Sequence, residues 1–397
     1  MKVGVFVFAV CTLAAMPAVA QSEWLQPGDL TDFSVWNSAD FLAHWPARGK
    51  EVGGPGITRV VLAQPGALLG LPIHSAGARF VRGEIDSLSI VFLDAGDFFG
   101  FQGTNLHGMS PQVGRKTFDE TFARDKAALL SGLQAMSGRP PTPFEPGEHG
   151  AFRAKALLFH AGNVWPRVLA VDHQLLMVDF FRSEKAARSL KSGALPPAPV
   201  MDPRAPRDTA GDKEVDGIPM VVQGNRGYCG VATLAMIGQY AGLQPGVEEY
   251  AALSGYQYGE TKSPDIRDLC ARVAQEAGLH SAREERFDFD RARISIDEGL
   301  PVLAFRRWSP QRDYLQTLYT GRMTRGEAGA ALPEPNMEDR KSWPGKDAPA
   351  HASIVVGYNL PRREVIFTES WGEQTRNRRM RTEELEATSY YAVYFTR

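Results

Sequence analysis

The chain has 397 residues, 43% of them hydrophobic, and a formal net charge of −2 at pH 7. This length exceeds one typical domain, so two domains are expected. Neither a basic stripe nor an acidic tail occurs, which argues against nucleic acid as a partner.

The first 20 residues have the pattern of a secretory signal peptide. Lys2 precedes an apolar run that ends in Ala18-Val19-Ala20, so cleavage is expected after Ala20. Cys11 lies within this run and lacks the preceding small residue that a lipid-anchor signal needs. No later segment reaches about 20 apolar residues, so no integral membrane segment is expected. The sequence therefore predicts an exported protein, periplasmic or extracellular.

Residues 192–217 are rich in Pro, Gly, Asp and Ala and show no apolar period. This composition is typical of a linker. It separates a first domain of residues 21–191 from a second domain of residues 218–397.

The first domain combines strand signals with one long helix. Residues 110–138 predict the helix, with Ser110 as its N-cap, Pro111 in its first turn and Gly138 beyond its end. Runs of β-branched and aromatic residues predict strands within 57–63, 77–83, 87–95 and 167–181. This combination indicates an α+β domain of unknown role. Its histidines do not have the spacing of metal ligands.

The second domain begins with helices and continues with strands. Apolar residues predict helices over residues 229–240, 263–279 and 287–299. Strand-like runs follow at residues 300–308, 351–359, 364–370 and 390–395. Helices followed by antiparallel strands indicate a two-layer α+β domain.

A cysteine opens the first of these helices. A helix N-terminus favours negative charge, so it lowers the pKa of a thiol and makes Cys229 a candidate nucleophile. Gly230 follows it and would let a substrate approach the backbone closely. Gln223 lies six residues upstream and could fold back as a second donor to an oxyanion, beside the Cys229 backbone N–H.

The partners of this thiol are expected far downstream. His351 opens an apolar strand and could take the proton of a cysteine nucleophile. Glu369 ends the next strand, and antiparallel pairing would bring it level with His351. Glu369 would then orient the imidazole ring.

Three motifs occur in one order: Gln-x5-Cys-Gly, His-Ala-x3-Val-Gly-Tyr, and an acidic residue followed by Ser-Trp-Gly. In order and spacing they resemble papain-like cysteine peptidases, in particular the bacterial branch of double-glycine (bacteriocin-leader) peptidases. The resemblance covers about residues 218–397. It implies hydrolysis of peptides or proteins through a thioester, without metal or cofactor. It also implies the site roles: Gln223 for the oxyanion hole, Cys229 as nucleophile, His351 as general base and acid, Glu369 as orienting group and Trp371 as a shield against water.

Some features leave alternatives open. Papain-like enzymes usually carry Asn or Asp where this chain has Glu369, so Asp347 or Asn359 could orient the histidine instead. Cys270 fits the core of its helix, but a Cys229–Cys270 bridge is the rival interpretation. The long connection 309–350 is expected either to form a wall of the cleft or to be a peripheral insertion.

The same residues also allow other functions. One alternative is a cell-wall peptide amidase or a transglutaminase-like acyl transferase. Another is a papain-like binding module without catalysis. The first domain, which precedes the peptidase-like part, could be inhibitory or could recruit substrate.

Overall fold

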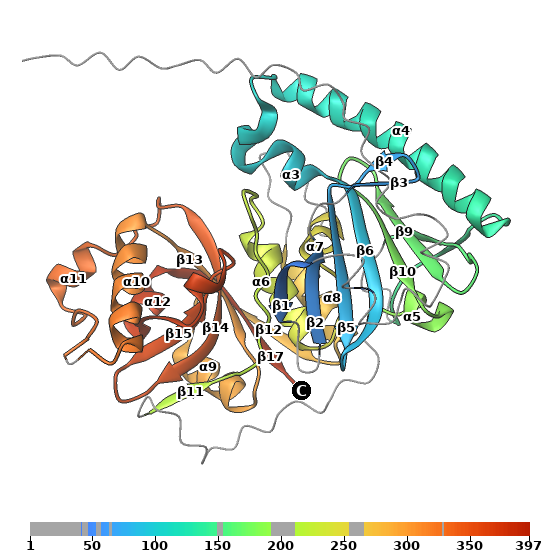
Figure 1. Cartoon of the computed structure of the whole chain (residues 1–397). Coiled ribbons are helices and arrows are strands. Elements are labelled where there is room, and N and C mark those ends of the chain that lie inside the picture. Colours follow the sequence, from blue (N-terminus) through green and yellow to red (C-terminus); the bar gives the residue numbers. More distant parts are fainter. Residues whose placement is uncertain are drawn as a thin grey trace, which may run out of the picture.

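The computed structural model describes residue 41 and residues 47–52, 57–62, 66–148, 154–191, 211–253, 266–327 and 329–397. The predicted signal peptide and most of the predicted linker lie outside this part of the chain. The described residues form two large antiparallel sheets and one small two-stranded sheet, with helices around them (Figure 1). The predicted α+β class is therefore confirmed.

The first sheet has eight strands in the order β1-β2-β5-β6-β10-β9-β8-β7. The predicted run 167–181 is not one strand, because a turn with His173 at φ 63° divides it into a hairpin. The strands are β1 (Ala47–Val52), β2 (Ile57–Leu62), β5 (Ser75–Val81), β6 (Glu84–Asp94), β7 (Thr142–Phe144), β8 (Ala156–Leu158), β9 (Trp165–Val171) and β10 (Leu175–Phe181). The short strands β3 (Ala67–Leu68) and β4 (Leu71–Pro72) pair separately.

Helix α4 (Pro111–Ser137) confirms the predicted long helix with its caps. The Ser110 side chain accepts a hydrogen bond from the Val113 N–H, and Gly138 ends the helix at φ 64°. Phe118, Phe122 and other apolar residues of α4 pack on one face of the first sheet. Three shorter helical segments complete this part: α3 (Ala95–Phe99), η1 (Phe101–Leu106) and α5 (Glu184–Arg188).

The second sheet has seven strands in the order β12-β17-β13-β14-β15-β16, with β11 paired to β14. Its strands are β11 (Asp212–Glu214), β12 (His280–Glu284), β13 (Val302–Arg307), β14 (Ala350–Asn359), β15 (Glu364–Thr368), β16 (Arg378–Arg381) and β17 (Ser389–Thr396). The helices are α6 (Cys229–Tyr240), α7 (Val247–Leu253), α8 (Ile266–Glu276), α9 (Phe289–Asp297), α10 (Pro310–Thr324), α11 (Met337–Lys341) and α12 (Thr382–Thr388), with a 3-10 turn η2 (Glu373–Thr375).

Strand β11 lies at the end of the predicted linker, so the second sheet begins earlier than its composition indicated. Asp212 and Glu214 pair with Asn359 and Gly357 across the β11–β14 ladder. The Asp212 carboxylate also accepts a hydrogen bond from Asn359 Nδ2 (2.6 Å). These long-range bonds draw a polar segment into a strand, although nothing in its own sequence has strand character.

Helices α6, α7 and α8 lie between the two sheets (Figure 1). Helix α6 packs on β14 of the second sheet, and α7 packs on β10 of the first. Successive residues of a strand face opposite sides. Thus Ile90 of β6 faces the α4 side, whereas Val91 joins a cluster with Ala252 of α7. The first sheet is therefore buried on both faces. Helix α4 covers one face, and the second domain packs against the other through α7.

Candidate active site

Cys229 is the first residue of α6, as the sequence predicted, and Tyr228 is its N-cap. The backbone N–H groups of Gly230 and Ala352 act to lower the pKa of its thiol, because they stabilise the negative charge of the thiolate. Cys270 is fully buried in the core of the second domain, and both cysteines are free thiols. The bridge between them, the rival interpretation, is therefore absent.

The imidazole of His351 lies between Cys229 and Glu369. His351 Nε2 is 2.7 Å from Glu369 Oε2, and the His351 ring is hydrogen-bonded to the Cys229 side chain. Since Nε2 faces the carboxylate, Nδ1 is the nitrogen left for the sulfur. The β14–β15 register, with Ile354 opposite Thr368, brings Glu369 to the strand that carries His351.

The pKa values of these three groups are shifted in directions that favour an ion pair. Burial acts to lower the pKa of His351, but the charge of Glu369 and the bond to Cys229 outweigh it and raise this pKa to about 9. Burial acts to raise the pKa of the Cys229 thiol, yet the His351 hydrogen bond and charge bring it below its usual value. Burial also opposes the charge of Glu369, but His351 and Arg306 lower its pKa to about 2. Each shift stabilises the charged form of its group, so the three together favour the thiolate, the imidazolium and the carboxylate over their neutral forms.

The Glu369 carboxylate is fully buried and has two further partners that the sequence analysis missed. Arg306 Nη2 donates to Glu369 Oε1 (2.6 Å), and Ser353 Oγ donates to the same oxygen (2.9 Å). Arg306 Nε also donates to Ser353 Oγ (2.9 Å), which closes the network. Arg306 of β13 stands directly opposite His351 of β14. A charged residue inside an otherwise apolar strand was the signal that could have indicated it.

Gln223 lies at the cleft, and its side-chain amide is held in place. Its Nε2 donates to the Arg226 backbone oxygen (3.0 Å), and its Oε1 accepts from Ser370 Oγ (2.6 Å). The Gln223 N–H also donates to the Ser370 carbonyl (2.8 Å). The amide nitrogen has two hydrogens, so one remains for another acceptor. The sequence predicted Gln223 at the site, but not this clamp by Ser370 and Arg226.

Aromatic side chains surround the cysteine and histidine in a cleft of about 680 Å³. Trp371 stacks on the His351 ring, with ring centres 4.5 Å apart, and Trp308 packs edge-on against Trp371. Gly230 belongs to the lining, and a Cβ atom there would lie 2.9 Å from Ile266 Cδ1. Other lining residues include Gln223, Phe305, Tyr390 and, from η1 of the first domain, Phe101 and Gln102.

The remaining candidates from the sequence lie elsewhere. Asn359 is at the far end of β14 and binds Asp212, and Asp347 is exposed, whereas Glu369 contacts His351 directly. The connection 309–350 forms α10 and α11, and α10 packs against β16. Its Arg312 is buried and hydrogen-bonded to Glu384 (2.9 Å). Only Pro349 and Ala350 at its end line the cleft, so most of this segment is a peripheral insertion.

No cluster of three or more metal-ligating side chains occurs among the residues that the structure describes. Within the same residues, no helix combines the length and apolar character needed to cross a membrane.

Residues 215–396 match the model of the Peptidase_C39 like family. This part of the chain is thus related to papain-like, double-glycine-type cysteine peptidases, as its motifs predicted. The first domain lies outside the matched residues. No curated protein matches the chain.

Two solved structures are similar to parts of the chain. One is a candidate C39-like peptidase from Bacillus anthracis, with 13% identity over 47% of this chain and 98% of that one, at a TM-score of 0.31. The other is the peptidase domain of Streptococcus ComA, a bifunctional ABC transporter involved in quorum sensing, with 14% identity over 44% and 96% at a TM-score of 0.28. Both TM-scores are below 0.5, so these likenesses carry no conclusion about activity.

Proposed function

We propose that the chain is an exported cysteine peptidase that hydrolyses peptide bonds through Cys229, His351 and Glu369. The observation that carries this proposal is the placement of the His351 ring between the Cys229 side chain and the buried Glu369 carboxylate. A nucleophile, a base and an orienting group within hydrogen-bond reach are the arrangement that covalent acyl transfer requires. The family match supports the same reaction class.

In the first half of the reaction, the Cys229 thiolate attacks the carbonyl carbon of the scissile peptide. The backbone N–H of Cys229 and the free amide hydrogen of Gln223 would stabilise the oxyanion. His351 then gives its Nδ1 proton to the leaving amine as the C–N bond breaks. The products of this half are a free amine and a thioester on Cys229.

In the second half, neutral His351 takes a proton from water, and the resulting hydroxide attacks the thioester carbon. The C–S bond breaks, a carboxylic acid leaves, and the thiolate–imidazolium pair is restored. Glu369 keeps Nε2 of His351 protonated throughout, so Nδ1 exchanges the proton. Trp371 covers the ring that makes this contact and limits access of water.

Export rests on the sequence of residues 1–20, which has the signal-peptide pattern. Together with the cleft, it makes peptides or proteins of the periplasm or the medium the expected substrates. A cell-wall amidase or an acyl transferase would use the same thioester but a different substrate or acceptor. A binding module without catalysis is disfavoured, because it has no need of a thiol whose pKa is lowered by a histidine.

The decisive experiment compares the mature protein with its Cys229→Ala variant on a random peptide library and on peptidoglycan stem peptides. We expect cleavage by the wild type and a loss of several orders of magnitude in the variant. The buried Cys270→Ala substitution is the matched control and should leave the turnover of folded protein unchanged. Full activity of Cys229→Ala on every cleaved peptide would refute the proposal, and cleavage of the stems alone would favour the amidase.

A further inference from the structure

The first domain contacts the loop that leads into the catalytic cysteine, residues 223–228. The Phe101 N–H donates to the Asn225 carbonyl (2.8 Å), and Asn225 Nδ2 donates to Thr104 Oγ1 (2.9 Å). Phe101 and Thr104 belong to η1, so this loop is bound by backbone and side-chain groups of another domain. A tethered domain that only recruits substrate would not need these bonds.

Arg226 is the centre of this interface. Its Nη1 lies 3.3 Å from Asp94 Oδ2 of the first domain and 2.8 Å from Glu248 Oε1 of the second. The side chains of Arg226 and Asp94 are 7% and 2% exposed, so their attraction is only weakly screened by solvent. Asp94 Oδ1 also accepts a hydrogen bond from Tyr228 Oη (3.0 Å), next to the cysteine.

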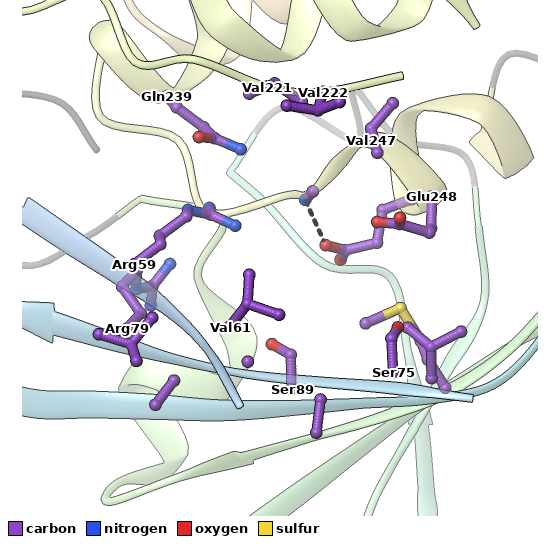
Figure 2. A pocket seen from close by; sticks show the side chains of 18 of the residues that line it. Arg59, Val61, Ser75, Arg79, Ser89, Val221, Val222, Gln239, Val247 and Glu248 are labelled. Atoms are coloured by element: carbon purple, nitrogen blue, oxygen red, sulfur yellow. Dashed lines mark hydrogen bonds between the residues drawn. The ribbon is translucent and has the colours of Figure 1, made fainter. Parts of the chain in front are cut away.

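Beside this cluster the two domains enclose a cavity of about 240 Å³ (Figure 2). Arg59 and Arg79 of the first sheet face Gln239 and Val247 of the second domain across it. Arg226 also lines this cavity. Arg59 also donates a hydrogen bond to the Gln244 carbonyl across this interface. Arg226 is thus one of several residues that join the two domains here, and among these it is the one that belongs to the loop before Cys229.

Arg226 in turn holds Gln223 through two bonds. Its Nε donates to the Gln223 carbonyl (2.6 Å), and its own backbone oxygen accepts from Gln223 Nε2 (3.0 Å). Ser370 binds Gln223 as well, so a displaced Arg226 would remove two of the bonds that fix the backbone and the side-chain amide of Gln223 and would loosen both. A donor to an oxyanion is effective only when it is fixed before the reaction.

We infer that Asp94 is a positioning residue of the active site: it holds Arg226, and Arg226 holds the amide of Gln223 at the cleft. The first domain thus contributes a residue that supports catalysis, and it does not act as an inhibitory segment. This inference rests on the proposed function, but it concerns a residue outside the part of the chain that matches the family.

The test uses the full mature chain and the variants Asp94→Asn, Arg226→Gln and their combination. Both oxygens of Asp94 accept hydrogen bonds, whereas an amide has only one acceptor, so Asn must lose one contact. Turnover is measured with a peptide that the wild type cleaves and is divided by the amount of Cys229 that iodoacetamide alkylates. Alkylation needs the thiolate but no oxyanion hole. A brief pulse is used, in which an ordinary thiol of an unfolded chain, with a pKa of about 8.5, reacts little, so this ratio corrects for the folded fraction.

We expect Asp94→Asn to lower kcat about tenfold to hundredfold, less than the complete loss of an oxyanion donor, with KM almost unchanged. Arg226→Gln should lower kcat by a similar factor. The double variant should lose no more kcat than Arg226→Gln alone, because Asp94 acts through Arg226. Asp86→Asn is the matched control. Asp86 lies on the same strand and binds Arg79 (2.9 Å) away from the cleft.

A second measurement does not depend on turnover. Amide hydrogen exchange of residues 222–228 should be faster in Asp94→Asn and unchanged in Asp86→Asn. Wild-type kcat in Asp94→Asn, multiplying losses in the double variant, or unchanged exchange would overturn the inference. Activity of Cys229→Ala would instead overturn the proposed function, and the exchange result would still decide the role of Asp94.

Discussion

His351 Nε2 and Glu369 Oε2 are 2.7 Å apart, and the carboxylate has no exposed surface. A buried carboxylate is stable only when other groups compensate its charge. Glu369 has this compensation from Arg306 and Ser353 on one oxygen and from His351 on the other. The group that contacts Nε2 of His351 is therefore a glutamate that is itself fixed by the sheet.

The first prediction concerns pH. The pKa of His351 is raised to about 9 by Glu369 and Cys229 against the effect of burial, so the imidazolium is lost as the pH rises through about 9. Since His351 must protonate the leaving amine, kcat/KM should fall on the alkaline side near this value. On the acid side, activity should rise as the Cys229 thiol, with its lowered pKa, ionises. A pH profile of kcat/KM, paired with one of iodoacetamide alkylation, measures both limbs.

The same pKa shift affects stability. A histidine has a pKa of about 6.5 in the unfolded chain, below its value in the folded protein. Its contribution to the free energy of unfolding is therefore fully present below about pH 6.5 and is lost as the pH rises through about 9. The Cys229 thiol, whose pKa is lowered in the folded protein, changes stability in the opposite direction over part of this range. Urea unfolding between pH 6 and 10 is therefore measured on Cys229→Ala, in which Glu369 still raises the pKa of His351. The decline should appear there and should be absent when His351→Gln is added. An equal decline in the double variant would contradict the assignment to His351.

The second prediction concerns Glu369→Gln. The amide keeps a similar size but loses the charge that raises the pKa of His351, so the alkaline limb should move to lower pH. We also expect kcat to fall about 10²-fold, within the range for impaired acid–base catalysis. Asp347→Asn is the control, because Asp347 is exposed and carries the other acidic side chain that the sequence offered as a partner of His351. An unchanged alkaline limb in Glu369→Gln would show that another group sets the pKa of the histidine.

The third prediction concerns Arg306→Met. This substitution removes the guanidinium but keeps much of the apolar side chain, and Oε1 of the buried Glu369 loses its cationic partner. Loss of one member of a buried pair typically costs about 3 kcal/mol or more of the free energy of unfolding. Urea denaturation measures the effect, and Arg307→Met, which changes the half-buried neighbour on the same strand, should cost much less.

A double variant separates charge from packing at this position. Arg306→Met with Glu369→Gln removes both charges, so part of the lost stability should return. Activity should not return, because His351 still lacks its carboxylate. Equal stability of the single and double variants would argue against a charge pair between Arg306 and Glu369.

The fourth prediction concerns Phe101, which lines the cleft from the first domain and is 49% exposed. Phe101→Ala should raise KM several-fold for peptides with large apolar side chains, since a bound side chain would lose the aromatic contact. It should leave kcat nearly unchanged, because Phe101 binds the loop before Cys229 through its backbone N–H, which the substitution keeps. Val113→Ala, at an equally exposed apolar residue of α4, is the control. An unchanged KM for all peptides would exclude Phe101 from the substrate site.

Local sequence signals predicted α4, α6, α8 and α9, but not α7, α10, α11 or α12. Ser110 and Gly138 bound α4 as predicted, and Cys229 opens α6, because caps and apolar spacing act within a few residues. Local signals predicted the strands less completely. The pairing of Asp212–Glu214 with β14 depends on residues about 145 positions away, so no local pattern predicted it.

By itself the sequence determined the order and chemistry of Gln223, Cys229, His351 and Glu369, since these motifs reside in short segments. Only the tertiary structure decided that Glu369 and not Asn359 contacts the histidine, and that Arg306 compensates its buried charge. It alone also revealed the contact of Asp94 with Arg226, 132 residues apart in the chain. The reason is physical: burial, and with it the strength of a charge pair, depends on which distant strands and domains pack together.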